Sequence, residues 1–487
     1  MAKKNNLIQS ITQWKVIIAI QVIASLVILG FLFKLGALPM KYILIIVAIL
    51  ALLCVGMFYM MKPSQVKNKG KVRNVVGKFL SIILSVILLV GTLYIAQGDS
   101  IISKITGADT QVNRISLVVL KDSSYEKASD LKNKTIGVNT QVDSDHMNQA
   151  LDALKKEVSS IQTKEETDFE VMADDLYTKK VEGIYLNESY YAILEEKHPD
   201  FLEKTKVIYT FEIEEKIKDI SKNVNVTKDP FVVYISGIDT YGKVSTVSRS
   251  DVNMIVTVNP KTKQVLLTSI PRDYFVPISH RNNANDKLTH SGLGGIESTV
   301  RTVENFMDVD INYYARVNFT SLIKMVDALG GVNVESIESF TAVSGHSFKK
   351  GTNYVNGEQA LAFSRERKNV SGGDNGRVAN QQRVITAMLN KMMSPAIIMN
   401  YSKVLNSIAG SFETNMSSSE ITSLLQMQID DMASWTIVQK QLIGKGVLQT
   451  GGSYMPNRKL YYMIPNEDSV AQNKGYIQKV LKGEPVE

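Results

Sequence analysis

The sequence predicts an α/β protein: an extracytoplasmic α/β/α sandwich with a mixed, largely antiparallel central sheet, a small accessory α/β domain and three N-terminal transmembrane helices. Two observations predict this. Three uncharged apolar runs occupy the first hundred residues, and further along the chain β-branched runs first follow one another and then alternate with amphipathic helices. Consecutive strand runs favour antiparallel pairing, and the later alternation favours helical layers on the sheet.

The three apolar runs, at 16–33, 42–61 and 79–96, are each close to the ~20 residues that a bilayer core requires. The first run has no small-residue cleavage site and two more follow it, so we interpret it as a retained anchor and not as a cleaved signal peptide. The chain is therefore predicted to be a multi-pass protein of the cell membrane.

Basic residues gather beside these runs. Eleven of the 55 lysines and arginines precede Asp99, and no acidic residue does. Because the whole chain carries +7, removing those eleven leaves −4 on the remainder, which argues against a nucleic-acid partner. Nine of the eleven lie in the N-terminal tail or in the 62–78 loop, so the positive-inside rule puts both in the cytoplasm and everything after about residue 97 outside the cell.

The outer portion divides at a polar segment that ends in Pro230. We predict three parts: residues 1–98 with the membrane helices, 99–225 as the accessory domain, and 226–487 as a larger α/β domain. The accessory part shows no phosphate loop and no carboxylate cluster, so a spacer or partner-docking role and a ligand-binding role stay equally open. Cys54, the only cysteine, lies in the second apolar run, so the outer parts have no disulfide.

Charged residues stand at the ends of three predicted strands, at 231–235, 253–258 and 264–270. They are Asp239 after the first strand, Arg249 and Asp251 before the second, and Arg272 and Asp273 after the third. Arginine forks bind phosphate oxygens, and paired carboxylates hold a hard divalent cation, so this layout predicts phosphoryl-transfer chemistry. Ordinary salt bridges at strand ends are an equally good interpretation of the stretch alone.

A second cluster follows in the stretch NGEQALAFSRERKNVSGGDNGRVANQQRV. A short helix ends in Arg365 and Arg367, a glycine-rich loop carries Asp374, and a long helix begins near Arg377 with Gln381 on the same face. The start of that helix offers free N–H groups and partial positive charge, which favour phosphate. A solvated basic surface is the competing interpretation.

The motifs GIDTYG, SRSDVNMIVTVNP, LLTSIPRDYFV, NGEQALAFSRERKN and GGDNGRVANQQRV resemble, in this order, those of the LytR–CpsA–Psr family. Capsule-biosynthesis members with three membrane spans and an accessory domain are the most similar. The resemblance covers about residues 230–393, and 401–480 is a plausible C-terminal part of the same domain.

The resemblance implies a membrane-anchored phosphotransferase. A glycopolymer, here capsular polysaccharide, moves from polyprenyl pyrophosphate onto peptidoglycan, and polyprenyl phosphate is released. By the same resemblance Asp239 and Asp251 bind the metal, and Gln381 and Lys287 contact the pyrophosphate together with five arginines: Arg249, Arg272, Arg365, Arg367 and Arg377. The family pattern often has another arginine where this chain has Asn380.

The residue types fit such a reaction. Several arginines and a cation neutralise a pyrophosphate and the charge that develops on the leaving phosphate. Aspartates favour Mg²⁺ or Mn²⁺, and the five histidines lack zinc-site spacing. We expect Arg272, Arg367 and Asp251 to be essential, with Asp273 or Asp374 as the base for the acceptor hydroxyl. We expect the helices at 296–306, 321–329 and 377–393 to line a slot for the prenyl chain.

Three alternatives stay open. The same residues would serve a hydrolase that uses water as the acceptor. A membrane regulator of transcription is disfavoured, because the cytoplasmic segments are too short for a helix-turn-helix. A non-catalytic scaffold would recruit capsule-synthesis proteins.

Overall fold

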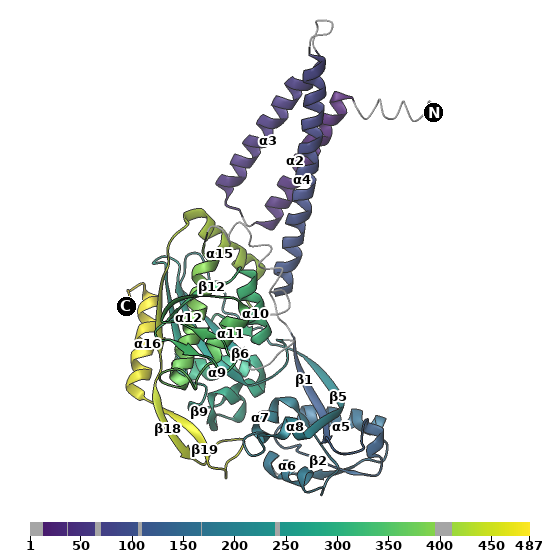
Figure 1. The fold of residues 1–487 in the computed structure, drawn as a ribbon, viewed down its shortest axis with the longest axis vertical. Coiled ribbons are helices and arrows are strands. Elements are labelled where there is room, and N and C mark those ends of the chain that lie inside the picture. The colour runs from purple at the N-terminus through teal and green to yellow at the C-terminus, as the bar shows by residue number, and fades with distance from the viewer. Residues whose placement is uncertain are drawn as a thin grey trace.

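The computed structural model of the chain describes residues 13–36, 38–63, 70–105, 110–166, 168–238, 244–394 and 412–487. Figure 1 shows three parts along the long axis: a helical bundle at one end, a large α/β domain next to it, and a small α/β domain at the far end. The mixed α/β class and the three apolar N-terminal helices agree with the prediction.

The bundle consists of α2 (Trp14–Leu35), α3 (Met40–Met61) and α4 (Lys71–Ile105). Each contains a segment long and apolar enough to cross a membrane: Trp14–Lys34, Met40–Met61 and Lys71–Leu93. Gln21 links all three helices, because its amide donates to Cys54 Sγ (3.5 Å) and accepts from Ser81 Oγ (2.5 Å). Polar bridges of this kind hold helices together in an apolar solvent, where hydrophobic burial drives little association.

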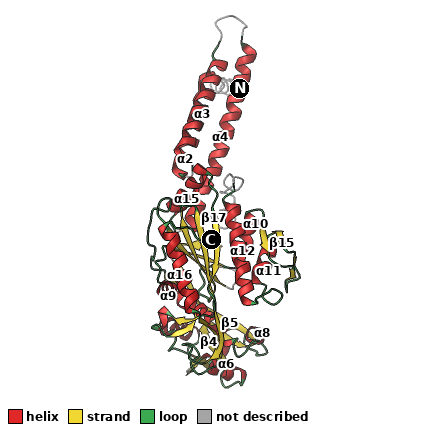
Figure 2. Cartoon of the chain, turned by 90° about the vertical axis from the view of Figure 1, so that its left-hand side faces the viewer, coloured by secondary structure: helices red, strands yellow, loops and turns green. Residues whose placement is uncertain are grey.

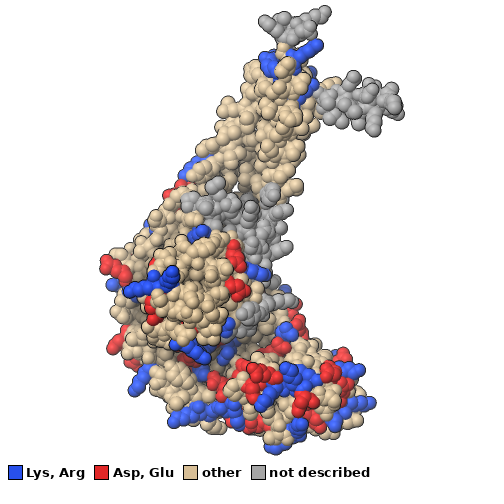
Figure 3. Space-filling view, viewed as in Figure 1, with Lys and Arg blue, Asp and Glu red and all other residues tan. Residues whose placement is uncertain are grey.

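The surface of the bundle is almost free of charge along its length, with basic residues at its outer tip (Figure 3). The start of α2, the end of α3 and the start of α4 lie toward that tip, and the end of α2 and the start of α3 lie at the other end, beside the large domain (Figure 1). This arrangement has the chain direction that the positive-inside rule requires.

The small domain is a five-stranded sheet in the order β3-β2-β4-β1-β5. Its strands are β1 (Thr110–Leu120), β2 (Thr135–Val138), β3 (Gln162–Glu165), β4 (Gly183–Asn187) and β5 (Thr205–Lys216). Its helical segments are η1 (Ala128–Leu131), α5 (Ser144–Glu157), α6 (Phe169–Tyr177), η2 (Glu188–Tyr190), α7 (Tyr191–Leu194) and α8 (Phe201–Lys204). Strand β5 extends to Lys216, so the segment 217–230 joins this sheet to the next, where we place the domain boundary.

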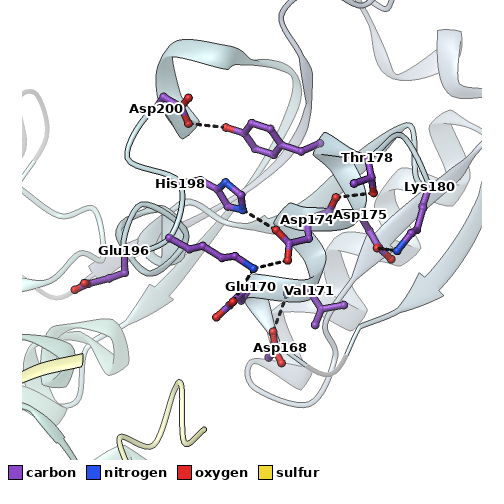
Figure 4. Close-up of polar contacts among 12 residues, drawn as sticks. Asp168, Glu170, Val171, Asp174, Asp175, Thr178, Lys180, Glu196, His198 and Asp200 are labelled. Carbon is purple, nitrogen blue, oxygen red and sulfur yellow. Dashed lines mark hydrogen bonds and ion pairs between the residues drawn. The ribbon is translucent and has the colours of Figure 1, made fainter. Parts of the chain in front are cut away.

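Carboxylates on α6 tie this helix to the segment before α8. Asp174 accepts from the imidazole of His198 at 2.9 Å and pairs with Lys197, which also reaches Glu170 at 2.6 Å (Figure 4). Glu196 points away from this cluster in the same view. Its partner belongs to the large domain, as described below.

The large domain is built on a six-stranded sheet in the order β16-β11-β6-β7-β8-β17. Three neighbouring pairs are antiparallel, and two, β6 with β11 and β8 with β17, are parallel. The strands are β6 (Phe231–Ile238), β7 (Ser250–Asn259), β8 (Gln264–Ile270), β11 (Tyr313–Val317), β16 (Phe412–Thr414) and β17 (Thr436–Gln441). The predicted bounds of β8 are confirmed, whereas β7 begins three residues before the predicted start, so Asp251 lies inside the strand.

Helices cover both faces of this sheet (Figure 2). On one face α9 (Gly295–Met307) and α16 (Glu467–Lys482) pack through Val300, Val303 and Ile477. On the other face α12 (Asp374–Met392) packs through Ile385 and Leu389. Helices α10 (Phe319–Ala328) and α11 (Gly357–Arg365) share a further core with α12.

The remaining elements surround these layers. They are β9 (Phe275–Pro277), η3 (Ser279–Arg281), β10 (Asn285–Lys287), η4 (Leu288–Gly294), β12 (Val332–Ser336), β13 (Phe340–Thr341), β14 (Ser347–Phe348), β15 (Gly351–Val355), α15 (Ser418–Asp431), β18 (Gly444–Gln449) and β19 (Leu460–Pro465).

The β18–β19 hairpin joins the large domain to the small one. Leu460 and Tyr462 on β19 are buried in one apolar cluster with Phe169 and Tyr190 of the small domain. Salt bridges flank this shared core, among them Arg458 with Glu170 at 2.7 Å. The two domains therefore share a hydrophobic core and do not move independently on a flexible linker.

At the opposite end, α15 lies against the turn between α2 and α3 (Figure 1). Lys41 Nζ is 2.7 Å from Asp430 Oδ1, and the Tyr42 hydroxyl donates to the carbonyl of Ile429 at 3.5 Å. The amide of Gln426 donates to the carbonyl of Gly36. These contacts seat one end of the large domain on the helical bundle.

Candidate functional site

A cavity of about 720 Å³ lies between the sheet of the large domain and helices α10, α11, α12 and α15. This volume falls in the range of about 300–1,000 Å³ that is usual for ligand pockets. Most of its wall is apolar, with valines and isoleucines of β6, β7 and β8 on one side and leucines and methionines of the helices on the other. Six charged residues also line it: Arg249, Asp251, Arg272, Arg365, Arg367 and Arg377.

The first three of these charged residues form a tight group at the start of β7 and the end of β8. Arg272 Nη1 donates to Asp251 Oδ1 at 2.9 Å, and an Arg249 nitrogen lies 3.9 Å from Asp251 Oδ2. Thr289 donates its hydroxyl to Asp251 Oδ1 at 2.9 Å. Burial opposes ionisation of Asp251, but the charges of Arg249 and Arg272 outweigh it, and the pKa of this carboxyl lies below its usual value.

The second group comes from the end of α11 and the start of α12. Arg377, Gln381, Val384 and Met388 all line the cavity, so the predicted face of α12 is confirmed. Arg377 pairs with Asp374 at 2.7 Å, one turn earlier on the same helix. The guanidinium of Arg365 lies over the ring of Phe319, 4.1 Å from its centroid, which fixes the direction of a long side chain.

Glycines make the turn that brings α12 to this position. Gly372 and Gly373 have φ angles of +80° and +56°, which residues with a Cβ adopt only under strain. A Cβ at Gly376 would lie 2.2 Å from the carbonyl oxygen of Ser371, so the first turn of α12 could not approach the loop with any other residue. Backbone geometry therefore explains the three glycines of the motif SGGDNG.

The charged end of the cavity has an excess of positive charge. Five arginines and one aspartate line it. Asp273 is 3.6 Å from Arg272, and Asp374 pairs with Arg377, yet the arginines still outnumber these carboxylates by two. Burial and the like charge of Arg272 lower the pKa of Arg377 although Asp374 opposes them. A guanidinium stays protonated under such conditions, so the site is suited to an anion with two negative charges.

The family model LytR_cpsA_psr matches residues 201–478, more than half of the chain. The chain belongs to the LytR–CpsA–Psr family. The match includes β5 of the small domain, the whole sheet of the large domain and nearly all of α16, so the C-terminal part that we assigned to the family domain is confirmed.

Curated members of the LytR–CpsA–Psr family resemble this part of the chain. The polyisoprenyl-teichoic acid–peptidoglycan teichoic acid transferase TagU of Enterococcus faecalis is 35% identical over 249 residues, which cover 50% of this chain and 80% of the relative. TagU of Bacillus subtilis is 38% identical over 271 residues, which cover 55% of this chain and 82% of the relative.

Solved structures of similar proteins include TagV of B. subtilis, 29% identical with a TM-score of 0.45, where the alignment covers 53% of this chain and 99% of TagV. A structure of TagT bound to LI-WTA is 28% identical with a TM-score of 0.43, and the alignment covers 54% of this chain and 94% of TagT.

Most of the residues that the family resemblance selected come together at the charged end of the cavity. Arg249, Asp251, Arg272, Arg365, Arg367, Arg377 and Gln381 line it, and Asp273 and Asp374 are salt-bridged to two of these arginines. Asp239 lies outside the residues that the structure describes. Asn380 is buried and accepts from Arg383 at 2.6 Å, so it takes no part in the lining.

Lys287 is not among the lining residues. Its ammonium is 2.7 Å from Glu196 of the small domain, and its side chain is only 7% exposed. Lys287 thus forms a salt bridge between the two domains and does not contribute to the cavity. The expected lining helix at 296–306 was also wrong: α9 packs on the opposite face of the sheet.

Asp251 meets one requirement of a metal ligand. Its Oδ2 is buried and has no hydrogen-bond partner among the described residues, so an oxygen lone pair is directed into the charged group. No group of three or more His, Cys, Asp or Glu side chains suited to a metal occurs in the described part of the chain. A carboxylate oxygen suits a hard cation, so Asp251 fits Mg²⁺ or Mn²⁺, with further ligands to come from elsewhere.

Three contributors were missed from the sequence. Thr289 holds Asp251, Phe319 supports Arg365, and Glu366 organises the segment between the two arginines. Glu366 is buried and accepts from the N–H groups of four residues: Val343, Arg367, Lys368 and Asn369. An acidic residue between two arginines suggests an ion pair, and only the fold shows that it binds backbone instead.

Proposed function

We propose that this chain is a membrane-anchored phosphotransferase that moves a glycopolymer from polyprenyl pyrophosphate onto peptidoglycan and releases polyprenyl phosphate. The observation that carries the proposal is one cavity with two kinds of wall. A long apolar wall suits a prenyl chain, and an end where five arginines lie with three carboxylates suits a pyrophosphate. The curated relatives are named for transfer of a polyisoprenyl-linked polymer to peptidoglycan, which supports the same reaction class.

The position of the cavity supports a lipid-linked donor. Its apolar end is lined by Leu424 of α15, and α15 contacts the turn between the first two membrane helices. A prenyl chain leaving the bilayer would meet this end first. The arginines lie at the other end, beside the start of β7 and the end of β8 and at the ends of α11 and α12 that face each other.

In the proposed reaction an acceptor hydroxyl attacks the phosphorus next to the glycan. A phosphodiester forms, and the bond to the bridging oxygen of the pyrophosphate breaks. The arginines bind the phosphate oxygens and stabilise the negative charge that develops on the leaving polyprenyl phosphate, as preorganised donors do in other phosphoryl transfers. Asp273 or Asp374 accepts the hydroxyl proton.

A divalent cation belongs to this proposal as a cofactor. Asp251 would hold it, together with Asp239, and the ion would neutralise phosphate charge when bound. We also propose that the large domain lies outside the cell, which the three membrane helices and the basic residues at the outer tip of the bundle support. We propose capsular polysaccharide as the polymer, because capsule-biosynthesis members share the arrangement of three spans and an accessory domain; capsule-synthesis proteins are then possible partners.

Product analysis in a purified system tests this function. The full-length protein in liposomes, with a lipid-linked glycan and peptidoglycan oligomers, is expected to join glycan to peptidoglycan. Arg272→Ala and Arg367→Ala are expected to lower the rate by about 10²–10³ without changing the melting temperature by more than a few degrees. Glycan released by water, with none joined to peptidoglycan, would instead identify a hydrolase.

A further inference from the structure

The outer face of the β18–β19 hairpin carries two exposed apolar side chains next to each other. Tyr461 is 44% exposed and Leu448 is 64% exposed, and the two are directly paired in the register of the hairpin. Their neighbours Leu460 and Tyr462 are buried in the core shared with the small domain. One face of the hairpin is therefore packed against the small domain, and the other face is exposed to solvent. The packing makes the exposed face a rigid surface.

The tyrosine ring lies next to Gly446 of its own hairpin. A Cβ at Gly446 would come within 2.8 Å of the Tyr461 ring, so the glycine leaves the room that the ring occupies. The residue still keeps nearly half of its surface in solvent. An aromatic side chain that is held in this way loses little conformational freedom on binding.

This surface adjoins the charged end of the cavity. The N–H of Met463 on β19 donates to the carbonyl of Asp273 at 2.8 Å, and Gln441 at the end of β17 donates to Asn375 at 3.2 Å. Burial and the charges of Asp273 and Asp374 raise the pKa of the Tyr461 phenol. The strand that carries Tyr461 is therefore hydrogen-bonded to Asp273, one candidate for the catalytic base, and Asn375, next to the other candidate Asp374, is bonded to the end of β17.

We propose that Tyr461 and Leu448 form the docking surface for the acceptor glycan. The inference rests on the proposed function and adds where its second substrate binds. Sugar rings present a face of C–H groups, slightly positive, that packs on the negative face of an aromatic ring. Their hydroxyls then reach neighbouring carboxylates, here Asp273 and Asp374.

The position of the hairpin in the molecule fits an acceptor from the cell wall. In Figure 1 β18 and β19 lie at the end of the large domain that is far from the membrane helices, whereas α15 lies next to those helices. Leu424 of α15 lines the apolar end of the cavity. Donor and acceptor would therefore approach the arginines from opposite directions. An in-line displacement requires that separation, because the attacking and leaving oxygens stand on opposite sides of the phosphorus.

Every bond that breaks in the proposed transfer is matched by a bond that forms. The acceptor hydroxyl oxygen forms a bond to the phosphorus next to the glycan, and its proton passes to Asp273 or Asp374. The bond to the bridging oxygen breaks, and the electron pair leaves with polyprenyl phosphate. No oxidant or further reactant is needed.

The test compares acceptor dependence in variants of the full-length protein in liposomes. With a fixed lipid-linked glycan, the transfer rate is measured against the concentration of peptidoglycan oligomers. Tyr461→Ala is expected to raise the acceptor KM about tenfold, whereas Tyr461→Phe keeps the ring and stays near the wild type. Leu448→Ala, at a more exposed position, is expected to raise it several-fold.

Two controls separate the possible failures. Tyr354→Ala changes a tyrosine that is 66% exposed on β15, away from the cavity lining, and is expected to leave the KM unchanged. Slow release of polyprenyl phosphate without acceptor is expected to be the same in Tyr461→Ala and wild type, which shows that the donor still binds. An unchanged acceptor KM in both Tyr461→Ala and Leu448→Ala overturns the inference alone. A wild type that joins nothing to peptidoglycan overturns the proposed function and the inference with it.

Discussion

Asp251 is buried between two arginines and a threonine hydroxyl, and one of its oxygens has no hydrogen-bond partner among the described residues. Such an oxygen is costly unless something binds it. A divalent cation would satisfy it and would bring the charge of a bound pyrophosphate closer to neutrality. Under the proposed function, the residue would therefore link metal and phosphate binding.

We predict that Asp251→Asn weakens Mn²⁺ binding by at least about tenfold and abolishes most of the transfer activity. Asparagine keeps the shape and the bond to Arg272 but loses the charge. Titration of Mn²⁺ by electron paramagnetic resonance measures binding without turnover. Asp122→Asn, at an exposed site on the small domain, is the control and should change nothing. Wild-type activity that persists in EDTA would contradict the metal assignment.

Single residues differ in how well the sequence reveals them. Arg249 and Arg272 were predictable because they flank strands, and neighbouring strands bring their ends together. Arg377 was predictable from its place at a helix start. The position of Lys287 was not predictable, because its partner Glu196 belongs to another domain. A local sequence pattern does not indicate a contact between domains. Tyr461 has no motif at all; only burial of its neighbours shows that it faces out.

At the scale of elements, the segment after α11 holds Arg365 and Arg367 by means of the carboxylate between them. Glu366 accepts from three successive N–H groups and from Val343, at distances between 2.6 and 3.1 Å. Burial opposes its ionisation, but these four N–H groups outweigh burial and keep the pKa of Glu366 below its ordinary value. The segment thus depends on one negative charge.

We predict that Glu366→Gln loosens this segment and lowers transfer activity, because an amide cannot accept all four hydrogen bonds. Losing bonds to a charged group costs about 1.5–3 kcal/mol of local stability. Since the folded-state pKa is depressed, the stabilisation is complete above the ordinary pKa of about 4.3 and is lost as the pH falls through the folded value. Hydrogen exchange of the amides at 367–369 measures both effects.

The comparison with Glu358→Gln makes this prediction specific. Glu358 lies on the first turn of the same helix and is exposed, so its substitution should leave exchange at 367–369 unaltered. Exchange in Glu366→Gln that equals the wild type near neutral pH would show that the carboxylate does not organise the segment.

Elements were predictable where the pattern is local. The run 264–270 forms β8 as expected, and the predicted face of α12 lines the cavity. For α9 the helical periodicity predicted the helix correctly, but we expected it on the wrong face of the sheet. Helical periodicity shows that one side is apolar, and it carries no information on which face of a sheet that side covers. As a result α12 lines the cavity, whereas α9 packs on the opposite face of the sheet and does not.

At the scale of the whole molecule, contacts at both ends orient the large domain. The shared core with the small domain holds the hairpin beside the charged end of the cavity. At the other end, α15 is seated on the turn between α2 and α3. A domain held in this way has the α15 side of its cavity next to the membrane helices. Membrane anchoring then supplies orientation in addition to location.

We predict that Lys41→Glu slows transfer from a long-chain lipid donor in liposomes, because Glu at this position would face Asp430 and Asp431 and push α15 away. An exposed ion pair contributes little on its own, so the expected loss is modest, roughly threefold. The double variant Lys41→Glu, Asp430→Lys restores the pair and should recover most of the rate. Transfer from a short-chain donor in detergent should be equal in all three proteins, because such a donor does not need to pass from bilayer to cavity. Equal rates in liposomes for wild type and Lys41→Glu would show that this contact does not guide the lipid.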